Sequence, residues 1–196
     1  MRTETRGEHE SVEALLPLMS PDLTRELYGN VLRCMHGVVH AWETWAAAHV
    51  PERLAGLVRK RRRDALLYAD LLVLGEKEGI ETLVPPPPFT AAFPDPTLHG
   101  DAFEAGFLGA MYVMEGSRLG GQHIARYVED KLGLAPGVGD AYFRGFGAGT
   151  GVMWSEFKAL LAGVPDEYTA EVISAAKAMF HYFADGIRPC ASRETA

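Results

Sequence analysis

Cysteine is scarce in this chain of 196 residues: Cys34 and Cys190 are the only two, and they lie far apart in sequence. We therefore expect neither a disulfide framework nor a cysteine-type zinc site. No apolar run reaches the roughly 18 residues that a membrane-spanning helix needs. The opening stretch MRTETRGEHE lacks the apolar core of a signal peptide. Together these absences predict a reducing, cytoplasmic setting.

An excess of positive charge is also missing. The chain has 19 Lys and Arg against 26 Asp and Glu, a formal net charge of −7. This balance argues against nucleic acid as a partner of the whole molecule. The hydrophobic fraction of 47% and the charged fraction of 23% are ordinary for a globular protein. The length suits one domain with a substantial core.

Clean strand-like alternation is absent as well, and apolar residues recur at helical spacing instead. Ser20 and Pro21 predict a helix start, with apolar residues following for about seven turns. Pro51 predicts a second helix that runs to about Gly75 or Gly79. Later helices are expected from near Asp101, around residues 154–161, and from Pro165 to about Gly186, whereas the proline-rich stretch 84–100 reads as a connection. The prediction is an all-α single domain over residues 1–196.

Three glycines interrupt one of these helices, within YVMEGSRLGGQHIAR. A glycine inside a helix costs about 1 kcal/mol relative to alanine, so Gly116, Gly120 and Gly121 need a physical reason. One interpretation is close packing against a neighbouring helix. The other is a flat ligand lying against a bent helix whose backbone is left bare. A haem would suit the second, but the glycines alone do not decide between them.

Haem iron needs an axial ligand, most often histidine, and the chain has seven histidines. His36 and His40 have metal-binding spacing, but they read as ordinary helix residues because no carboxylate pattern surrounds them. His9 differs, because Glu13 follows it by one helical turn. A carboxylate there can hold one ring nitrogen and leave the other for a metal. Solvated helix faces also produce such pairs often, so this spacing alone is weak.

Two segments carry a resemblance to a known family. MRTETRGEHESVE resembles the first-helix segment of haem oxygenases, in which a basic residue, a threonine, the proximal histidine and a glutamate follow in order, here Arg2, Thr5, His9 and Glu13. EGSRLGGQ resembles the family's distal helix, with its pattern Gly-x-x-x-Gly-Gly-Gln. The form EGSxLGG is similar to the bacterial branch that often accompanies phytochromes. FKALL and AAKAMF, which contain Lys158 and Phe180, also resemble family segments.

The resemblance implies a haem oxygenase-like helical fold with haem between the first helix and a kinked glycine-rich helix. It implies opening of the ring with O2 and electrons from an external donor, such as ferredoxin or its reductase, to biliverdin, CO and free iron. A bacterial phytochrome would accept the biliverdin. The implied roles are iron ligand for His9, support of that ligand for Glu13, and propionate-binding cations for Arg2 and Lys158. The other implied site residues are Gly116, Ser117, Gly120, Gly121 and Phe180.

Two positions depart from the family pattern. Many members have an aspartate directly after the first distal glycine, where it orders the water network that delivers protons, whereas this chain has Ser117. A second propionate-binding cation often lies one turn after the position of Lys158, whereas this chain has Ala162. Arg118 and Arg126 are possible substitutes, although both read more readily as surface residues. A haem carrier or sensor without turnover, and a helical protein whose glycines only pack helices, therefore stay open as alternatives.

The run RKRRRD, residues 59–64, is the strongest local concentration of positive charge. One interpretation is a docking patch for an acidic electron donor. The other, which we favour slightly, is a solvated helix face. Five consecutive cations span more than one helical turn, so they cannot all point in one direction.

Overall fold

The structure, a computed structural model, describes residues 1–75 and 98–191. Those residues form helices and turns and no strand, which confirms the all-α prediction. The α-helices are α1 (Arg6–Leu15), α2 (Arg25–His49), α3 (Ala55–Lys60), α4 (Asp64–Val73), α5 (Gly100–Gly116), α6 (Gly121–Leu132), α7 (Ala141–Arg144), α8 (Thr150–Ala162) and α9 (Thr169–Ala191). Single 3₁₀ turns lie at Pro17–Met19, Glu52–Leu54, Gly147–Gly149 and Asp166–Tyr168. The proline-rich stretch 84–97 lies outside the described residues.

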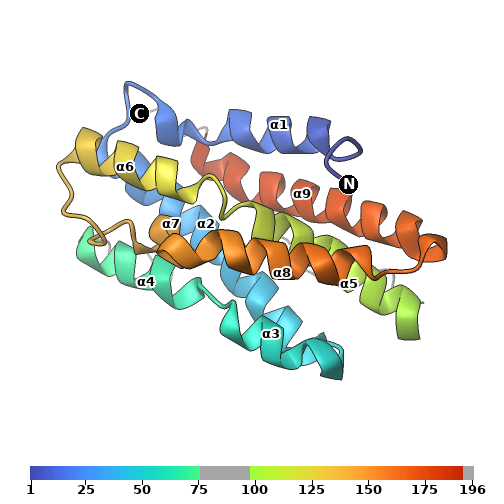
Figure 1. The fold of residues 1–196 in the computed structure, drawn as a ribbon. Helices are drawn as coiled ribbons and strands as arrows, with labels where there is room; N and C mark the ends of the chain where they lie inside the picture. Colours follow the sequence, from blue (N-terminus) through green and yellow to red (C-terminus); the bar gives the residue numbers. More distant parts are fainter. Residues whose placement is uncertain (76–97, 192–196) are drawn as a thin grey trace.

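The long helices α2, α5 and α9 form the centre of the bundle (Figure 1). Helix α9 packs against α1, α2 and α5, while α8 covers α5 and α4 lies against α2. Glycines permit two of the closest crossings. A Cβ at Gly109 would collide with the backbone of Val172 in α9, and one at Gly186 would collide with the side chain of Val38 in α2. The buried apolar side chains of these helices form a single cluster.

Helix α2 begins later than Ser20 and Pro21 predict. Its N-cap is Thr24, whose side-chain oxygen accepts the N–H of Leu27 at 3.1 Å. The Ser20 hydroxyl instead accepts the N–H of Asp22, which holds a turn before the helix. Two side chains of the same capping type lie four residues apart here, and the sequence does not rank them. The predicted length of about seven turns agrees with the 25 residues observed.

The single helix predicted from Pro51 is broken into a 3₁₀ turn, α3 and α4. The break falls at residues 61–63, inside the basic run. Glu43 of α2 stabilises it, because its carboxylate accepts the backbone N–H groups of Arg63 at 2.6 Å and Asp64 at 3.3 Å, at the start of α4. Glu43 is only 5% exposed, and burial raises its pKa to about 7. A residue from another helix thus fixes the break, so no local pattern could reveal it.

The two cysteines form a disulfide between α2 and the last turn of α9, with the Cα atoms of Cys34 and Cys190 6.2 Å apart. From the sequence we expected no disulfide framework and a reducing setting, and we did not foresee this single bridge between the two cysteines. Their separation of 156 residues hid the pairing, because only the packing of α9 on α2 brings them together. Separately, no helix in the described part of the chain is long and apolar enough to cross a bilayer.

Candidate functional site

Helix α1 presents His9 at the surface of the bundle. Thr5, which is 2% exposed, anchors the start of this helix by donating its hydroxyl to the Met1 carbonyl at 3.1 Å. The His9 Nδ1 lies 3.3 Å from a Glu13 carboxylate oxygen, the pairing that their spacing predicts. The ring edge rests on Phe180 of α9, with the ring centroids 5.9 Å apart. More than half of the His9 side chain, 55%, is exposed, so the imidazole is oriented but accessible.

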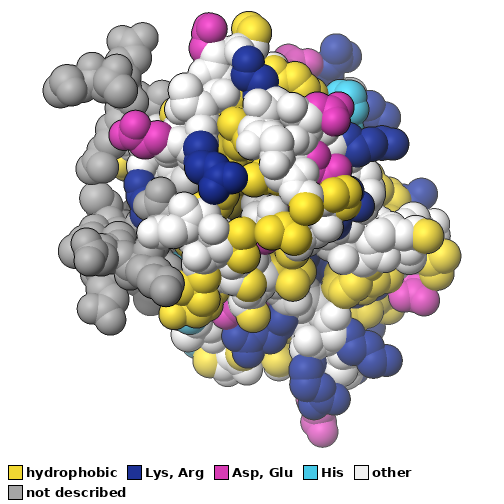
Figure 2. Space-filling view, turned by 90° about the vertical axis from the view of Figure 1, so that its left-hand side faces the viewer, with side chains coloured by type: hydrophobic (Ala, Val, Ile, Leu, Met, Phe, Trp, Pro, Cys, Tyr) yellow, Lys and Arg dark blue, Asp and Glu magenta, His cyan; other side chains and the backbone are white. Residues whose placement is uncertain are grey.

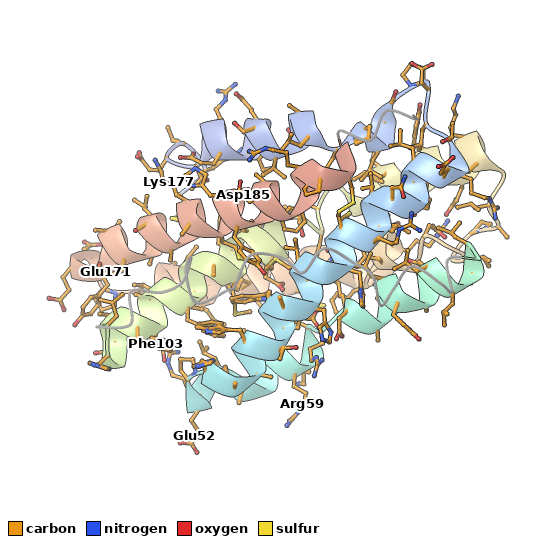
Figure 3. The ribbon with its side chains drawn as sticks, turned by 180° about the vertical axis from the view of Figure 1, so that it is seen from behind. Glu52, Arg59, Phe103, Glu171, Lys177 and Asp185 are labelled. Carbon is orange, nitrogen blue, oxygen red and sulfur yellow. A yellow bond between two sulfur atoms is a disulfide. The ribbon has the colours of Figure 1, made fainter. Side chains whose placement is uncertain are left out.

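Helix α1 is attached to the rest of the molecule mainly through α9. None of its ten residues is buried. Glu8 pairs with Lys177 of α9 at 3.2 Å, on the side of α9 that lies toward α1 (Figure 3). The partly buried Val12 packs against the core. An amphipathic helix normally buries its apolar stripe, so α1 leaves apolar surface available for another group.

The glycine segment forms a kink between α5 and α6. Helix α5 ends at Gly116 and α6 begins at Gly121, and the chain between them turns through short-range hydrogen bonds. The N–H of Leu119 donates to the Gly116 carbonyl at 3.0 Å, and that of Gly121 donates to the Arg118 carbonyl at 3.2 Å. Leu119 is 49% exposed beside the bare glycines. In Figure 1 this junction lies below α1, between the green-yellow α5 and the yellow α6.

The three glycines have two different physical reasons. Gly121 is buried, and a Cβ on it would collide with the Phe143 carbonyl oxygen, so this glycine is required by helix packing. A Cβ on Gly120 would meet nothing within 4 Å. A Cβ on Gly116 would only reach the Trp154 ring, at 4.0 Å. Packing therefore accounts for one glycine and leaves Gly116 and Gly120 unexplained, which favours a ligand beside those two.

Ser117 lies on the first residue of the kink, and two hydrogen bonds hold its hydroxyl. The Oγ donates to the Met114 carbonyl at 2.8 Å and accepts from an Arg63 Nη at 3.3 Å. The same Arg63 nitrogen donates to the Met114 carbonyl at 3.1 Å, and its guanidinium lies 4.4 Å from the centre of the Tyr142 ring. Sequence reasoning did not include Arg63 in the site. The available signal was that five consecutive cations span more than one helical turn and cannot all point in one direction.

The basic run is neither a solvated helix face nor a single exposed patch. Arg61 and Arg63 are buried at the helix break, whereas Arg59, Lys60 and Arg62 are exposed. Figure 3 shows Arg59 pointing away from the body of the protein. A docking role could rest only on the three exposed cations.

Arg118, expected at the surface, is instead 7% exposed and pairs with the buried Glu115 at 3.0 Å. Arg61 pairs with the same carboxylate and donates to the Met153 carbonyl at 3.0 Å. Burial and the nearby Arg63 lower the pKa of Arg118 to about 10. A pocket beside these groups is lined by their side chains together with Trp42, Val58, Met111 and Met114. This polar cluster supports the kink from the side of α3 and α4.

The remaining predicted residues occupy separate positions. Arg2 precedes α1 and Lys158 lies on α8, and both side chains are exposed. Phe180 is buried and touches His9. Gln122 donates its amide to the Arg144 carbonyl, which ties α6 to α7. The exposed Arg126 donates to the Gln122 carbonyl at 3.2 Å. The structure thus joins His9, Glu13 and Phe180 in one group, and the kink residues in another.

The other histidines do not form a metal centre. His36 and His40 stack with ring centroids 5.7 Å apart, and His40 lies 3.3 Å from Asp64. Burial lowers the pKa of His36, as expected for a neutral helix residue. Across residues 1–75 and 98–191, no group of three or more His, Cys, Asp or Glu could hold a metal ion. An iron that arrives inside its own macrocycle needs only one protein ligand, and His9 suits that requirement.

Comparison with known proteins assigns the family. The model of the family described as Heme oxygenase matches residues 1–188. This chain belongs to the haem oxygenase family. A protein named "Heme oxygenase" from Xanthomonas campestris pv. campestris (strain 8004) is 30% identical over 162 residues, covering 81% of this chain and 87% of that protein. Membership of the haem oxygenase family makes haem the substrate and the chain an enzyme that degrades it.

The residues present fit haem as a substrate. An accessible, carboxylate-supported imidazole on α1 suits iron, and a kinked backbone without side chains at Gly116 and Gly120 suits a planar ring. The incompletely buried apolar side of α1 and the exposed Leu119 add apolar surface. The backbone of the kink and the Ser117 hydroxyl can orient water. A distal histidine, which favours other chemistry, is not among residues 116–121.

Proposed function

We propose that this chain opens haem with O2 and external electrons, giving biliverdin, CO and free iron. The observation that carries the proposal is the pairing of two features: the accessible His9 imidazole and the glycines at 116 and 120, whose bareness packing does not explain. Family membership supports haem degradation in general. The resemblance of EGSRLGG to the bacterial branch supports biliverdin as the product.

In this proposal the protein holds the ring and positions water. His9 binds the iron through Nε2, since Glu13 lies at Nδ1 and fixes the tautomer. Phe180 supports the imidazole edge, and Arg2 and Lys158 supply the opposite charge that the propionates require. Gly116 and Gly120 let the backbone approach the ring, whereas Gly121 contributes by allowing α6 to pack on Phe143. When bound, haem supplies both the O2-binding iron and the ring that is oxidised.

The partners follow from the same proposal. The reaction consumes electrons that no residue of the chain supplies, so we propose ferredoxin or its reductase as the donor. The exposed cations Arg59, Lys60 and Arg62 suit an acidic partner. We propose a bacterial phytochrome as acceptor of biliverdin, on the strength of the EGSxLGG form alone. A cytoplasmic setting stays a prediction, and the Cys34–Cys190 disulfide does not support its premise of a reducing environment.

Reconstitution with hemin tests the proposal. Purified protein is mixed with hemin, the Soret band is recorded, and then a ferredoxin and ferredoxin reductase system or ascorbate is added. We expect a complex whose Soret band disappears while the broad red absorption of biliverdin appears. A stable complex that never bleaches would instead support a haem carrier or sensor. The absence of any complex would contradict the proposal and favour a helical protein that does not bind haem.

The His9→Ala variant tests the iron ligand. We expect turnover to be lost while weak hemin binding persists, because the walls of the site remain. His181→Ala is the matched control, since His181 is exposed on α9 and has no role in the proposal. Normal turnover by His9→Ala would remove His9 from the mechanism.

A further inference from the structure

Arg63 is a buried cation that contacts the kink from behind. It lies at the break between α3 and α4, is 3% exposed, and reaches α5 with one guanidinium nitrogen. The backbone N–H of Arg63 is held by Glu43, so both ends of the residue are fixed. Its guanidinium rests on the face of the Tyr142 ring. Contacts to a carbonyl, a hydroxyl and an aromatic face replace the water that burial removes.

We propose that Arg63 is a positioning residue for haem cleavage, which fixes the Ser117 hydroxyl and supplies positive charge to the distal side. This inference rests on the proposed function. Arg63 belongs to the basic run 59–64 and lies outside the two motifs that resemble the family. In this inference it orients the side chain at position 117, where many family members carry an aspartate.

The hydrogen-bond inventory of Ser117 explains how the positioning works. A serine hydroxyl has one proton to donate and two lone pairs to accept with. The proton is committed to the Met114 carbonyl, and Arg63 occupies one lone pair. One accepting site is left, with its direction set by the other two bonds. The Ser117 oxygen can therefore accept one hydrogen bond from a water molecule, and the direction of that bond is fixed. Without Arg63, both lone pairs of the oxygen would be free, and a water could donate to either of them.

No carboxylate pairs with the Arg63 guanidinium among the described residues, because Glu43 accepts only the backbone N–H of Arg63. Among the described residues, the side-chain contacts of its guanidinium are to Met114, Ser117 and Tyr142, none of which is a carboxylate. Glu115, the nearest buried acid on α5, is shared by Arg61 and Arg118 instead. An aspartate at position 117 would pair with Arg63 and cancel its field. With serine at position 117, the positive charge of Arg63 would favour loss of a proton from water held beside bound haem.

Three variants and one control test this. Arg63→Met removes the positive charge. Arg63→Lys keeps the charge but loses the planar guanidinium and its fixed donor directions. Ser117→Asp leaves Arg63 in place and adds a carboxylate that neutralises its charge. Arg59→Met removes an exposed cation of the same run. For each ferric hemin complex we would titrate the absorption spectrum and find the pH midpoint between its acid and alkaline forms. Thermal unfolding of the haem-free proteins and biliverdin yield would be measured alongside.

We expect the midpoint to rise by about one pH unit in Arg63→Met and in Ser117→Asp, because a nearby unit charge shifts a titration by this order. Arg63→Lys should keep the wild-type midpoint but give a lower biliverdin yield, and Arg59→Met should leave the midpoint unchanged. If Arg63→Met does not fold, Ser117→Asp still provides the test. Unchanged midpoints in both Ser117→Asp and Arg63→Met would overturn the inference. A wild-type complex that binds hemin but never turns over would count against the proposed function instead.

Discussion

Gly120 and Gly121 provide the sharpest test of why the junction between α5 and α6 lacks side chains. Gly120→Ala and Gly121→Ala make the same chemical change one residue apart, at the start of α6. If both glycines serve only to pack helices, both substitutions should destabilise the haem-free protein. If Gly120 faces a ligand, its substitution should leave the fold intact and impair haem binding.

The structure sets the expected magnitudes. A Cβ at position 121 would lie 3.2 Å from the Phe143 carbonyl carbon and collide with the attached oxygen, and this neighbour is backbone, which cannot rotate away. Overpacking of this kind costs about 1–3 kcal/mol. A Cβ at position 120 meets nothing within 4 Å. Gly120 has a φ of −80°, which alanine adopts freely, so the free energy of unfolding should stay within about 0.5 kcal/mol of wild type.

Urea unfolding of the haem-free variants, followed by far-UV circular dichroism, measures the first effect. Each kcal/mol corresponds to about 2–4 °C in Tm for a chain of this size, so a thermal scan gives an independent check. Hemin titration followed at the Soret band measures the second effect. We expect Gly121→Ala to lower stability and Gly120→Ala to weaken hemin binding at unchanged stability.

Two results would refute this reasoning. Equal destabilisation by both substitutions would mean that Gly120 packs against protein after all. A stable Gly120→Ala variant with wild-type hemin affinity and turnover would mean that the ring does not approach that position. Gly116→Ala extends the series, because the Trp154 ring lies 4.0 Å from its added Cβ, which is an ordinary van der Waals distance.

The other predictions concern the supports of the fold. Replacing both Cys34 and Cys190 with alanine, or reducing them with dithiothreitol, should lower the free energy of unfolding by up to about 5 kcal/mol, because the bridge closes a loop across 156 residues; an unchanged urea midpoint would show that the bridge does not form. The stabilising contribution of Glu43 should be lost as pH rises from about 4.5 to 7, because its pKa of about 7 in the fold lies above the unfolded value; the difference in unfolding free energy between wild type and Glu43→Gln, measured across this range, checks it. Arg61→Met should cost about 3–5 kcal/mol by leaving buried Glu115 short of a partner, whereas Arg59→Met should cost almost nothing.

Much of the fold could be predicted from sequence because helical periodicity is a local property. The long helix before residue 49, the helix beginning near residue 100 and the final helix all carry regular apolar spacing, and all are present. The kink was also foreseeable, since glycines at 116, 120 and 121 weaken a helix. The sequence predictions failed where contacts between residues far apart in the chain determine the local structure. Glu43 creates the break at Arg63, and the packing of α9 on α2 creates the disulfide.

The candidate site divides in the same way. His9 and Glu13 could be paired from spacing alone, because four residues is one helical turn. The separate roles of Gly120 and Gly121 could not, because they depend on where Phe143 lies. Arg63 escaped notice for the same reason. Its neighbours Met114 and Ser117 are more than fifty residues away, and a run of cations reads as solvent-facing until the chain around it is folded.

The bridge between Cys34 and Cys190 turns most of the polypeptide into a covalent ring that includes the kink, Arg63 and Lys158. Helix α1 lies outside that ring, has no buried residue, and is held to α9 by contacts such as Glu8 with Lys177. The proposed iron ligand His9 thus lies on a helix outside the covalent ring, whereas the kink between α5 and α6 lies inside it. In the proposed site, displacement of α1 would therefore separate His9 from the kink without opening the covalent ring.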